Sequence, residues 1–183
     1  MLNRKDSYFH KAKREGYFAR SAYKLLEINK KYKLIKHGDK VLDIGCSPGS
    51  WTQVAFELGA ERVVGIDLTL SKIRDKKFEF IHGNFEIVDI DDKFDVVLSD
   101  VAPSTTGHMD AEISIDLSER AFETAKKVLK KNGNFVCKVF QGKGFEELIR
   151  KIRKDFEFFK ISKPKASRKS SRETYIIGKI YKG

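Results

Sequence analysis

Four residues whose side chains could do chemistry together lie far apart in the chain: Lys24, Asp100, Lys138 and Glu173. Two ammonium and two carboxylate groups in one pocket could orient a polar substrate, transfer a proton and stabilise developing charge. Each residue taken alone is better interpreted as half of a surface ion pair, which contributes little to stability. The motifs around these residues, and the elements that carry them, decide between the two interpretations.

A loop at residues 43–51 precedes the last three of these residues and reads Asp-Ile-Gly-Cys-Ser-Pro-Gly-Ser-Trp. It follows an expected strand and precedes an expected helix, and its glycines allow a ligand to approach the backbone closely. Ser47 and Ser50 stand where a dinucleotide fingerprint needs glycine, and no Gly-Lys-Ser/Thr follows as in a Walker loop. The glycines present, Gly45 and Gly49, suit a ligand without a pyrophosphate, such as S-adenosylmethionine.

Three further residues are candidate contacts for such a ligand. Asp67 ends the next expected strand, where a carboxylate can accept hydrogen bonds from ribose hydroxyls, although it could also cap a turn. Asn84 follows the third expected strand and could accept from an adenine amino group, but Gly-Asn is also ordinary turn chemistry. Trp51 could pack beside the cofactor or staple the start of a helix.

The apolar pattern that must position these residues alternates between strands and helices. Strands are expected at residues 40–45, 61–67, 78–81, 94–99, 134–140, 157–161 and 174–180. Helices are expected at residues 21–31, 51–58, 112–131 and 144–156, with Ser21 and Ser50 as N-caps and Asn132-Gly133 ending the third. A loop at 101–110 carries Pro103 and Gly107. This order predicts an α/β fold with a mostly parallel sheet covered by helices on both faces.

Length and charge narrow the class of protein. A chain of 183 residues favours one domain, residues 1–183. The net charge of +11 and a pI near 9.5 are typical of a protein that meets a polyanion, and nucleic acid is favoured over a merely solvated basic surface. A cofactor loop and a lysine/carboxylate cluster on such a chain indicate group transfer onto nucleic acid.

Several other classes are excluded by what the sequence lacks. It has no apolar run near the ~18 residues that span a bilayer and no recognisable signal peptide, so we expect a cytoplasmic protein that does not bind membranes. Cys46 and Cys137 are not spaced as metal ligands, and the four histidines are scattered, so no metal site is expected. No spare apolar stripe is evident, and we expect a monomer.

Five motifs in order closely resemble the RrmJ/FtsJ family of large-subunit ribosomal RNA methyltransferases. They are the loop at 43–51, Arg-Ser-Ala-Tyr-Lys-Leu-Leu-Glu at 20–27, Leu-Ser-Asp-Val-Ala-Pro at 98–103, Val-Cys-Lys-Val-Phe-Gln-Gly at 136–142 and Ser-Arg-Glu at 171–173. The resemblance covers nearly the whole chain, from about residue 8 to residue 183. It implies a Rossmann-like methyltransferase fold with a seven-stranded sheet whose last strand is antiparallel.

The resemblance also implies a reaction and a set of site residues. The methyl donor would be S-adenosylmethionine, and the acceptor the ribose 2′-hydroxyl of an RNA nucleotide, usually a uridine of large-subunit ribosomal RNA. The family's acceptor-site tetrad falls on Lys24, Asp100, Lys138 and Glu173. Its cofactor contacts fall on Gly49, Trp51, Asp67, Asn84 and Asp100. Asn84 departs from the aspartate common in bacterial relatives, which keeps an acceptor oxygen but removes a charge.

The role of Lys138 stays open between two alternatives. It could accept the proton of the ribose hydroxyl, or donate a hydrogen bond that orients the hydroxyl and stabilises negative charge on its oxygen. Lys24 would tune the local field and hold the substrate. Asp100 would sit between the amino group of the cofactor and Lys138, and Glu173 would orient a lysine or the ribose.

RNA contacts are expected from the two ends of the chain. The segment 1–20 mixes basic and aromatic residues, and a second basic stretch includes Lys160, Lys163, Lys165, Arg168, Lys169 and Arg172. Two rivals remain: methylation of the transfer RNA anticodon loop, and a non-catalytic RNA-binding assembly factor. A nicotinamide-dependent dehydrogenase is disfavoured because its glycine pattern is missing.

Overall fold

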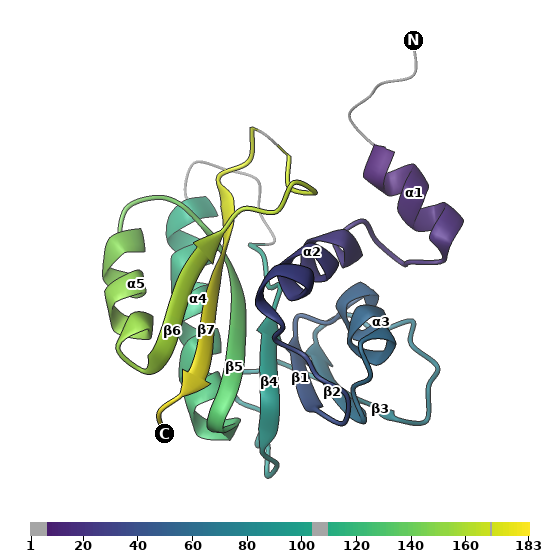
Figure 1. Cartoon of the computed structure of the whole chain (residues 1–183), viewed down its shortest axis with the longest axis horizontal. Coiled ribbons are helices and arrows are strands. Elements are labelled where there is room, and N and C mark those ends of the chain that lie inside the picture. Colours follow the sequence, from purple (N-terminus) through teal and green to yellow (C-terminus); the bar gives the residue numbers. More distant parts are fainter. Residues whose placement is uncertain (1–6, 104–109, 169) are drawn as a thin grey trace.

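A computed structural model describes residues 7–103, 110–168 and 170–183 of the chain. Its strands are β1 (Lys40–Ile44), β2 (Arg62–Asp67), β3 (Phe78–His82), β4 (Phe94–Ser99), β5 (Leu129–Phe140), β6 (Phe156–Ser162) and β7 (Glu173–Tyr181). They form one seven-stranded sheet in the order β3-β2-β1-β4-β5-β7-β6, as Figure 1 shows. The first five strands run parallel, and β7 is antiparallel to both β5 and β6. The predicted mostly parallel sheet with an antiparallel last strand is confirmed.

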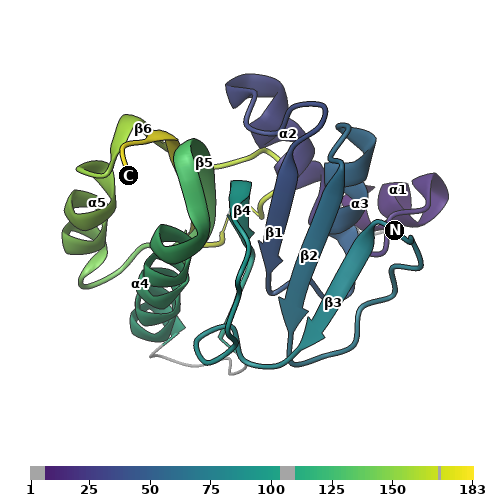
Figure 2. The ribbon, with the colours of Figure 1, turned by 90° about the horizontal axis from the view of Figure 1, so that it is seen from below.

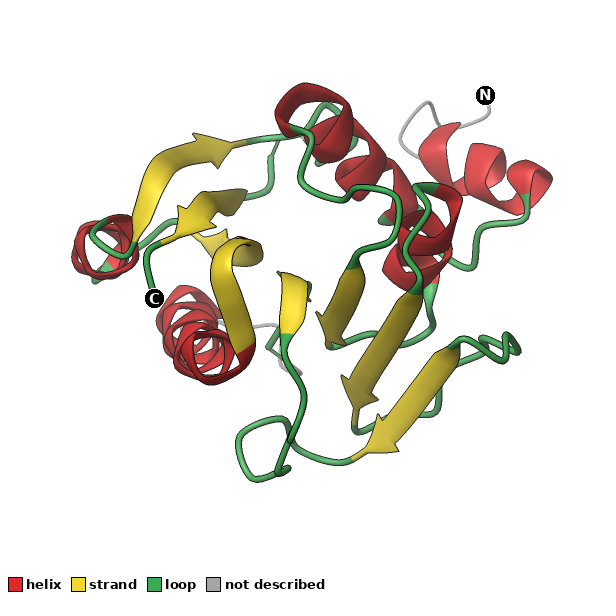
Figure 3. Ribbon diagram, turned by 60° about the horizontal axis from the view of Figure 1, so that its bottom comes forward, coloured by secondary structure: helices red, strands yellow, loops and turns green. Residues whose placement is uncertain are grey.

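Helices cover both faces of this sheet (Figures 2 and 3). The helices are α1 (Ser7–Glu15), α2 (Ala22–Tyr32), α3 (Ser50–Glu57), α4 (Asp110–Val128) and α5 (Phe145–Arg153). The buried faces of α2 and α3 share one hydrophobic cluster with β1, β2 and β4, whereas α4 and α5 pack into a second cluster on the opposite face. The parallel strands are therefore covered on both sides, which explains why successive residues of β1 and β4 are buried rather than alternate ones.

Several expected boundaries are wrong, and tertiary packing explains the largest error. We expected a helix to residue 131, but α4 ends at Val128 and Leu129 begins β5, where it is buried and pairs with Phe94. Asn132 adopts the left-handed conformation in place of Gly133, with φ 68°. The helix expected at 144–156 spans only α5, because Phe156 already belongs to β6. The segment 1–20 contains α1, which the sequence analysis did not anticipate.

Of the two predicted serine caps, one lies at the predicted position and one is wrong. Ser21 is the N-cap residue of α2, but its side chain makes no capping hydrogen bond, whereas Ser50 is the first residue of α3, whose N-cap is Gly49. The hydroxyl groups of Ser21 and Ser50 lie 3.0 Å apart and are hydrogen-bonded to each other. These hydroxyls tie the start of α2 to the cofactor-type loop instead of capping a helix.

The strand order reverses between β1 and β4, since β2 and β3 follow on one side of β1 and β5 on the far side of β4. In open α/β sheets, ligands bind at the carboxyl ends of strands beside such a switch point. The loop at 43–51 and Asp100 both follow strands that end there. Within the described residues, no helix is long and apolar enough to cross a membrane.

Candidate active site

A cavity of about 560 Å³ opens at the carboxyl ends of β1 to β4. Its size falls in the range of roughly 300–1,000 Å³ that is typical of small-molecule sites. The polar part of its lining includes Ser47, Asp67, Asn84, Glu86 and Asp100, and its apolar part includes Ile66, Phe85, Val101 and Leu117. An apolar slot lined also by carboxylates and one side-chain amide suits a nucleoside-type ligand.

Gly45 allows two strand ends to approach each other at the floor of this cavity. It has a φ of +75°, and a Cβ atom there would lie 2.9 Å from Val101 Cγ2 and 3.1 Å from the Val101 backbone nitrogen. A larger residue would therefore strain the backbone and push Val101, which itself lines the cavity. Glycine at this position therefore lets the loop after β1 lie close to Val101 and preserves the shape of the cavity.

Asp67 and Asn84 both line the cavity, and each also makes local turn contacts. Asp67 accepts hydrogen bonds from the backbone N–H groups of Ser47 and Thr69, at 2.9 and 2.8 Å. Asn84 Oδ1 accepts from the backbone N–H of Glu86 at 3.0 Å. The ligand-binding and turn-forming interpretations thus coexist, because a carboxyl or amide oxygen can accept more than one hydrogen bond.

Gly49 and Trp51 do not line this cavity. A Cβ atom on Gly49 would lie 2.6 Å from Ile73 Cγ1, so the space beside Gly49 is filled by protein. Trp51 is 2% exposed, donates from Nε1 to the backbone oxygen of Ser21 at 3.0 Å, and packs near the ring of Tyr175. The structure therefore favours the stapling interpretation of the Trp51 side chain over contact with a ligand.

Lys138 and Asp100 form the first half of the predicted tetrad. Lys138 lies near the end of β5 with its side chain 7% exposed, and its Nζ donates to the backbone oxygen of Asp100 at 2.6 Å. The same Nζ lies 3.3 Å from Asp100 Oδ1. Because Asp100 also lines the cavity, this residue joins the ligand slot to the lysine.

Lys24 and Glu173 form the second half. Lys24 Nζ, on α2, lies 2.8 Å from each carboxylate oxygen of Glu173 at the start of β7. Burial acts to raise the pKa of Glu173, but its pairing with Lys24 and a hydrogen bond from Ser167 hold that pKa below its ordinary value. Glu173 is therefore ionised at neutral pH, and its carboxylate holds the Lys24 ammonium in place.

Tyr175 links the two halves and was missed by the sequence analysis. The residue is fully buried, and its hydroxyl lies 3.2 Å from Asp100 Oδ1 and 3.2 Å from Glu173 Oε1. Burial, followed by the charges of these two carboxylates, raises the pKa of Tyr175 well above its ordinary value, so it stays neutral. The signal was present, since residues two apart in a strand face the same side.

The four predicted residues are thus gathered into one chain of polar contacts, in which the single proton of the Tyr175 hydroxyl lies within reach of both carboxylates. Lys24 contacts Glu173, Glu173 contacts Tyr175, Tyr175 contacts Asp100, and Asp100 contacts Lys138. These contacts bring together helix α2 and strands β4, β5 and β7, from both halves of the sequence. Two cations and two anions held in this way can orient a hydroxyl group and stabilise charge that develops on its oxygen.

Asp43, at the end of β1, is a buried acid that the sequence analysis treated only as part of the loop. Thr52 Oγ1 donates to Asp43 Oδ2 at 2.8 Å, while Oδ1 is buried without a hydrogen-bond partner. Burial, followed by the nearby charges of Asp100 and Asp67, raises the pKa of Asp43 to about 7 despite the hydrogen bond from Thr52. This carboxyl group has an unusually high cost of ionisation.

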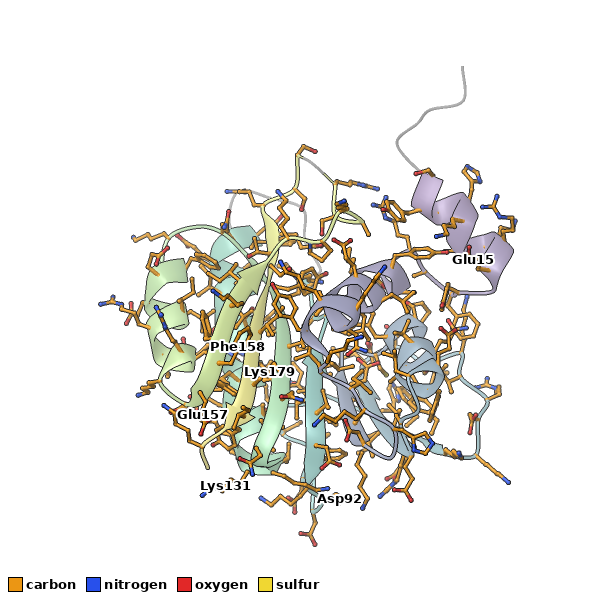
Figure 4. The ribbon with its side chains drawn as sticks, in the orientation of Figure 1. Glu15, Asp92, Lys131, Glu157, Phe158 and Lys179 are labelled. Atoms are coloured by element: carbon orange, nitrogen blue, oxygen red, sulfur yellow. The ribbon has the colours of Figure 1, made fainter. Side chains whose placement is uncertain are left out.

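Residues 7–20 pack beside the β6–β7 loop, which we define as residues 163–172 without the undescribed Lys169. Tyr8 and Tyr17 pack against Tyr23 of α2, and Tyr23 also donates to Glu15, labelled in Figure 4, at 2.7 Å. These three tyrosine rings are therefore engaged with one another. Phe9 and Phe18, at 50% and 40% exposure, are the aromatic side chains of this segment that a ligand could reach.

The basic side chains expected to meet RNA are mostly on the surface. Lys160 of β6 is exposed, and so are Lys163, Lys165, Arg168 and Arg172 of the β6–β7 loop. Residues 1–6, Lys169, Gly107 and His108 lie outside the described part of the chain. Within the described residues, no cluster of three or more His, Cys, Asp or Glu side chains could hold a metal ion.

The strand order, with its antiparallel β7 between β5 and β6, is that of Rossmann-like methyltransferases, and the cavity lies where that fold binds its methyl donor. The model of the FtsJ-like methyltransferase family matches residues 17–181, and the chain belongs to this family. The resemblance read from the five motifs is thereby confirmed.

Individual relatives agree along the whole chain. The protein named ribosomal RNA large subunit methyltransferase E from Archaeoglobus fulgidus is 45% identical over 191 residues, covering 100% of this chain and 99% of the relative. Its namesake from Desulfatibacillum aliphaticivorans is also 45% identical, covering 98% and 92%. A crystal structure described as a ribosomal RNA methyltransferase from Plasmodium falciparum superposes with a TM-score of 0.80 at 28% identity, covering 91% of this chain and 100% of that one.

Proposed function

We propose that this chain, acting as one methyltransferase domain, transfers a methyl group from S-adenosylmethionine to a ribose 2′-hydroxyl of large-subunit ribosomal RNA. The observation that carries the proposal is the position of Asp100, which lines the cavity and also contacts Lys138 at 2.6 Å. A ligand in the cavity and a hydroxyl held by Lys138 would meet at this residue. The relatives named ribosomal RNA large subunit methyltransferase E support the substrate class.

Different cavity residues would bind different parts of S-adenosylmethionine. Asp67 would accept from the ribose hydroxyls, Asn84 from the adenine amino group, and Asp100 from the amino group of the methionine end. Gly49 and Trp51 would act indirectly, by fixing the loop that precedes α3. When bound, this cofactor supplies an electrophilic methyl group on a sulfonium, which a hydroxyl oxygen can displace in line.

The acceptor side must hold the hydroxyl in line with that methyl group, which is mainly a positioning task. Lys138 Nζ would contact the hydroxyl oxygen, either accepting its proton or donating a hydrogen bond to it. Lys24 would add positive charge on the far side of the ribose, with Glu173 fixing its ammonium group. Asp100 would keep Lys138 at the border between the two ligands.

RNA would dock along α1 and the β6–β7 loop, both of which neighbour Lys24 and Glu173. Arg20, next to α2 in sequence, donates to the backbone oxygen of Ala166, and so holds the two basic segments side by side. The exposed lysines and arginines would contact phosphates, and Phe9 or Phe18 would stack an unpaired base. Single-stranded or looped RNA fits this arrangement better than a regular duplex.

The decisive experiment supplies the purified chain with radiolabelled S-adenosylmethionine and one of three acceptors. These are large ribosomal subunits from cells that lack the protein, deproteinised ribosomal RNA, and transfer RNA. We expect label in large-subunit ribosomal RNA, recovered as a 2′-O-methylated nucleoside. Label in transfer RNA alone would favour the rival substrate, label on a base would overturn the ribose assignment, and calorimetry without cofactor binding would favour a non-catalytic RNA-binding factor.

A further inference from the structure

The β6–β7 loop is fastened to the N-terminal helices by three contacts close together in sequence. The backbone N–H of Lys165 donates to both carboxylate oxygens of Glu27, at 3.0 and 2.8 Å. Ala166 is 1% exposed, packs among Ala12 and Tyr23, and its backbone oxygen accepts from Arg20 at 2.6 Å. The middle of this basic loop is therefore part of the core beneath α1 rather than a free surface segment.

Ser167, the next residue, connects that anchored segment to the acceptor site. It is 8% exposed, and its Oγ donates to Glu173 Oε1 at 2.7 Å. Its backbone N–H donates to Pro164 at 2.9 Å, which fixes the direction of the side chain through a turn. Arg168, one residue further on, is exposed and faces the solvent from which RNA would arrive.

Most of the acceptor capacity of the Glu173 carboxylate is used by protein groups. Lys24 contacts both oxygens, Ser167 donates to Oε1, and the Tyr175 hydroxyl lies 3.2 Å from Oε1. A carboxylate has about four lone-pair sites, so little capacity is left for a substrate. Glu173 therefore acts through Lys24, and whatever fixes Glu173 also fixes the Lys24 ammonium.

We propose that Ser167 is a positioning residue that ties the β6–β7 loop to Lys24 through Glu173. This inference rests on the proposed methyl transfer to RNA. When phosphates engage Lys165 and Arg168 on either side, Ser167 keeps the Glu173 carboxylate, and with it Lys24, in the geometry that the bound ribose requires. The loop thereby positions the acceptor site as well as holding RNA.

The test compares Ser167→Ala with Ser167→Thr, which restores a hydroxyl. We expect Ser167→Ala to lower kcat about tenfold, with the KM for RNA within twofold and cofactor binding by calorimetry unchanged. Because Ser167 helps to keep the pKa of Glu173 low, its loss should also move the acidic limb of the pH–kcat profile to higher pH. Ser167→Thr should recover most of the rate and the original limb.

The matched control is Thr124→Ala, which removes a half-buried hydroxyl from the C-terminal part of α4, outside the β6–β7 loop, and should leave kcat, KM and the pH profile unchanged. A Ser167→Ala enzyme with wild-type kcat and pH profile would overturn the inference. So would a loss of rate that threonine does not restore and that leaves the pH limb in place, since that pattern indicates general loosening of the loop. Failure of the wild-type chain to methylate any RNA would instead overturn the proposed function.

Discussion

Lys138 Nζ donates to the backbone oxygen of Asp100 at 2.6 Å, so the lysine is held by the main chain as well as by a carboxylate. A backbone partner cannot rotate away or change its charge, which fixes the lysine more firmly than an ion pair alone. Asp100 in turn lines the cavity. The relationship places the lysine at the boundary of the ligand slot, with 7% of its side chain exposed.

Replacing Lys138 with methionine should abolish most activity while preserving the fold, because methionine keeps the length and apolar volume of the buried stem. Loss of a positioned proton-transfer or oxyanion-stabilising group costs roughly 10²–10⁴-fold in rate. We therefore expect kcat to fall at least about 100-fold, with cofactor affinity unchanged by calorimetry. Methyl transfer near the wild-type rate would remove Lys138 from the mechanism.

Lys138→Arg separates the two roles that remain open. Arginine keeps the positive charge but does not give up its proton in proteins, so it can donate a hydrogen bond and cannot serve as a base. If Lys138 accepts the ribose proton, the arginine variant should be as inactive as the methionine variant. Partial activity in single-turnover assays would assign Lys138 as an orienting donor.

Tyr175→Phe should weaken the site without unfolding the protein. The variant keeps the buried ring and its packing against Trp51, but the carboxylates of Asp100 and Glu173 lose the hydroxyl between them. We expect the free energy of unfolding to fall by about 1 kcal/mol. We also expect kcat to fall, because Asp100 and Glu173, which hold Lys138 and Lys24, both lose the neighbouring hydroxyl. Denaturant titrations and initial rates measure the two effects.

The control for this change is Tyr181→Phe, which removes a tyrosine hydroxyl at the opposite end of β7. Its kcat should match the wild type. Equal kcat for Tyr175→Phe and the wild type would show that the two halves of the tetrad work without their bridge.

How far the sequence alone predicts this site depends on which contacts are local. The strand at 94–99 matches β4, and the four tetrad residues do gather, because each lies in a motif whose local structure is strongly specified. The sequence analysis placed Asp100 beside Lys138 and left Glu173 to orient a lysine or the ribose. That Glu173 holds Lys24 depends on how α2 and β7 pack, and was not predicted. The early end of α4 was missed for the same reason, because burial of Leu129 outweighs its local helical preference.

Asp43→Asn should change how stability depends on pH. The pKa of Asp43 is raised from 3.8 to about 7 in the folded chain, so between these values the folded state holds one proton more than the unfolded state. The wild type therefore loses about 1.4 kcal/mol of stability for each pH unit of increase across this window. Asparagine does not titrate and should be free of this loss.

The measurement is denaturant unfolding of both proteins at pH 4.5, 6 and 7.5. The free energy of unfolding of the variant, relative to that of the wild type, should increase as the pH rises. This difference should level off once the pH exceeds the folded pKa of about 7. Other titrating groups are common to both proteins and cancel in the comparison. Parallel stability curves would contradict a raised pKa at Asp43.

Arg168→Gln should reduce the salt dependence of RNA binding. Arg168 is exposed on the β6–β7 loop, next to the serine that contacts Glu173. A residue that contacts one phosphate contributes about one to the slope of log K against log salt concentration, because its binding releases a condensed counterion. We expect weaker binding across RNA sequences and a slope smaller by about one, measured by fluorescence anisotropy over a salt series.

Arg153→Gln provides the matched control, since Arg153 is also an exposed arginine but ends α5 just before β6, at the end of that strand opposite the β6–β7 loop. Its basic side chain is accounted for by the favourable interaction of cations with a helix C-terminus. The control should leave both affinity and salt slope unchanged. An equal loss in both variants would mean that net charge, and not a docking surface beside the tetrad, governs RNA binding.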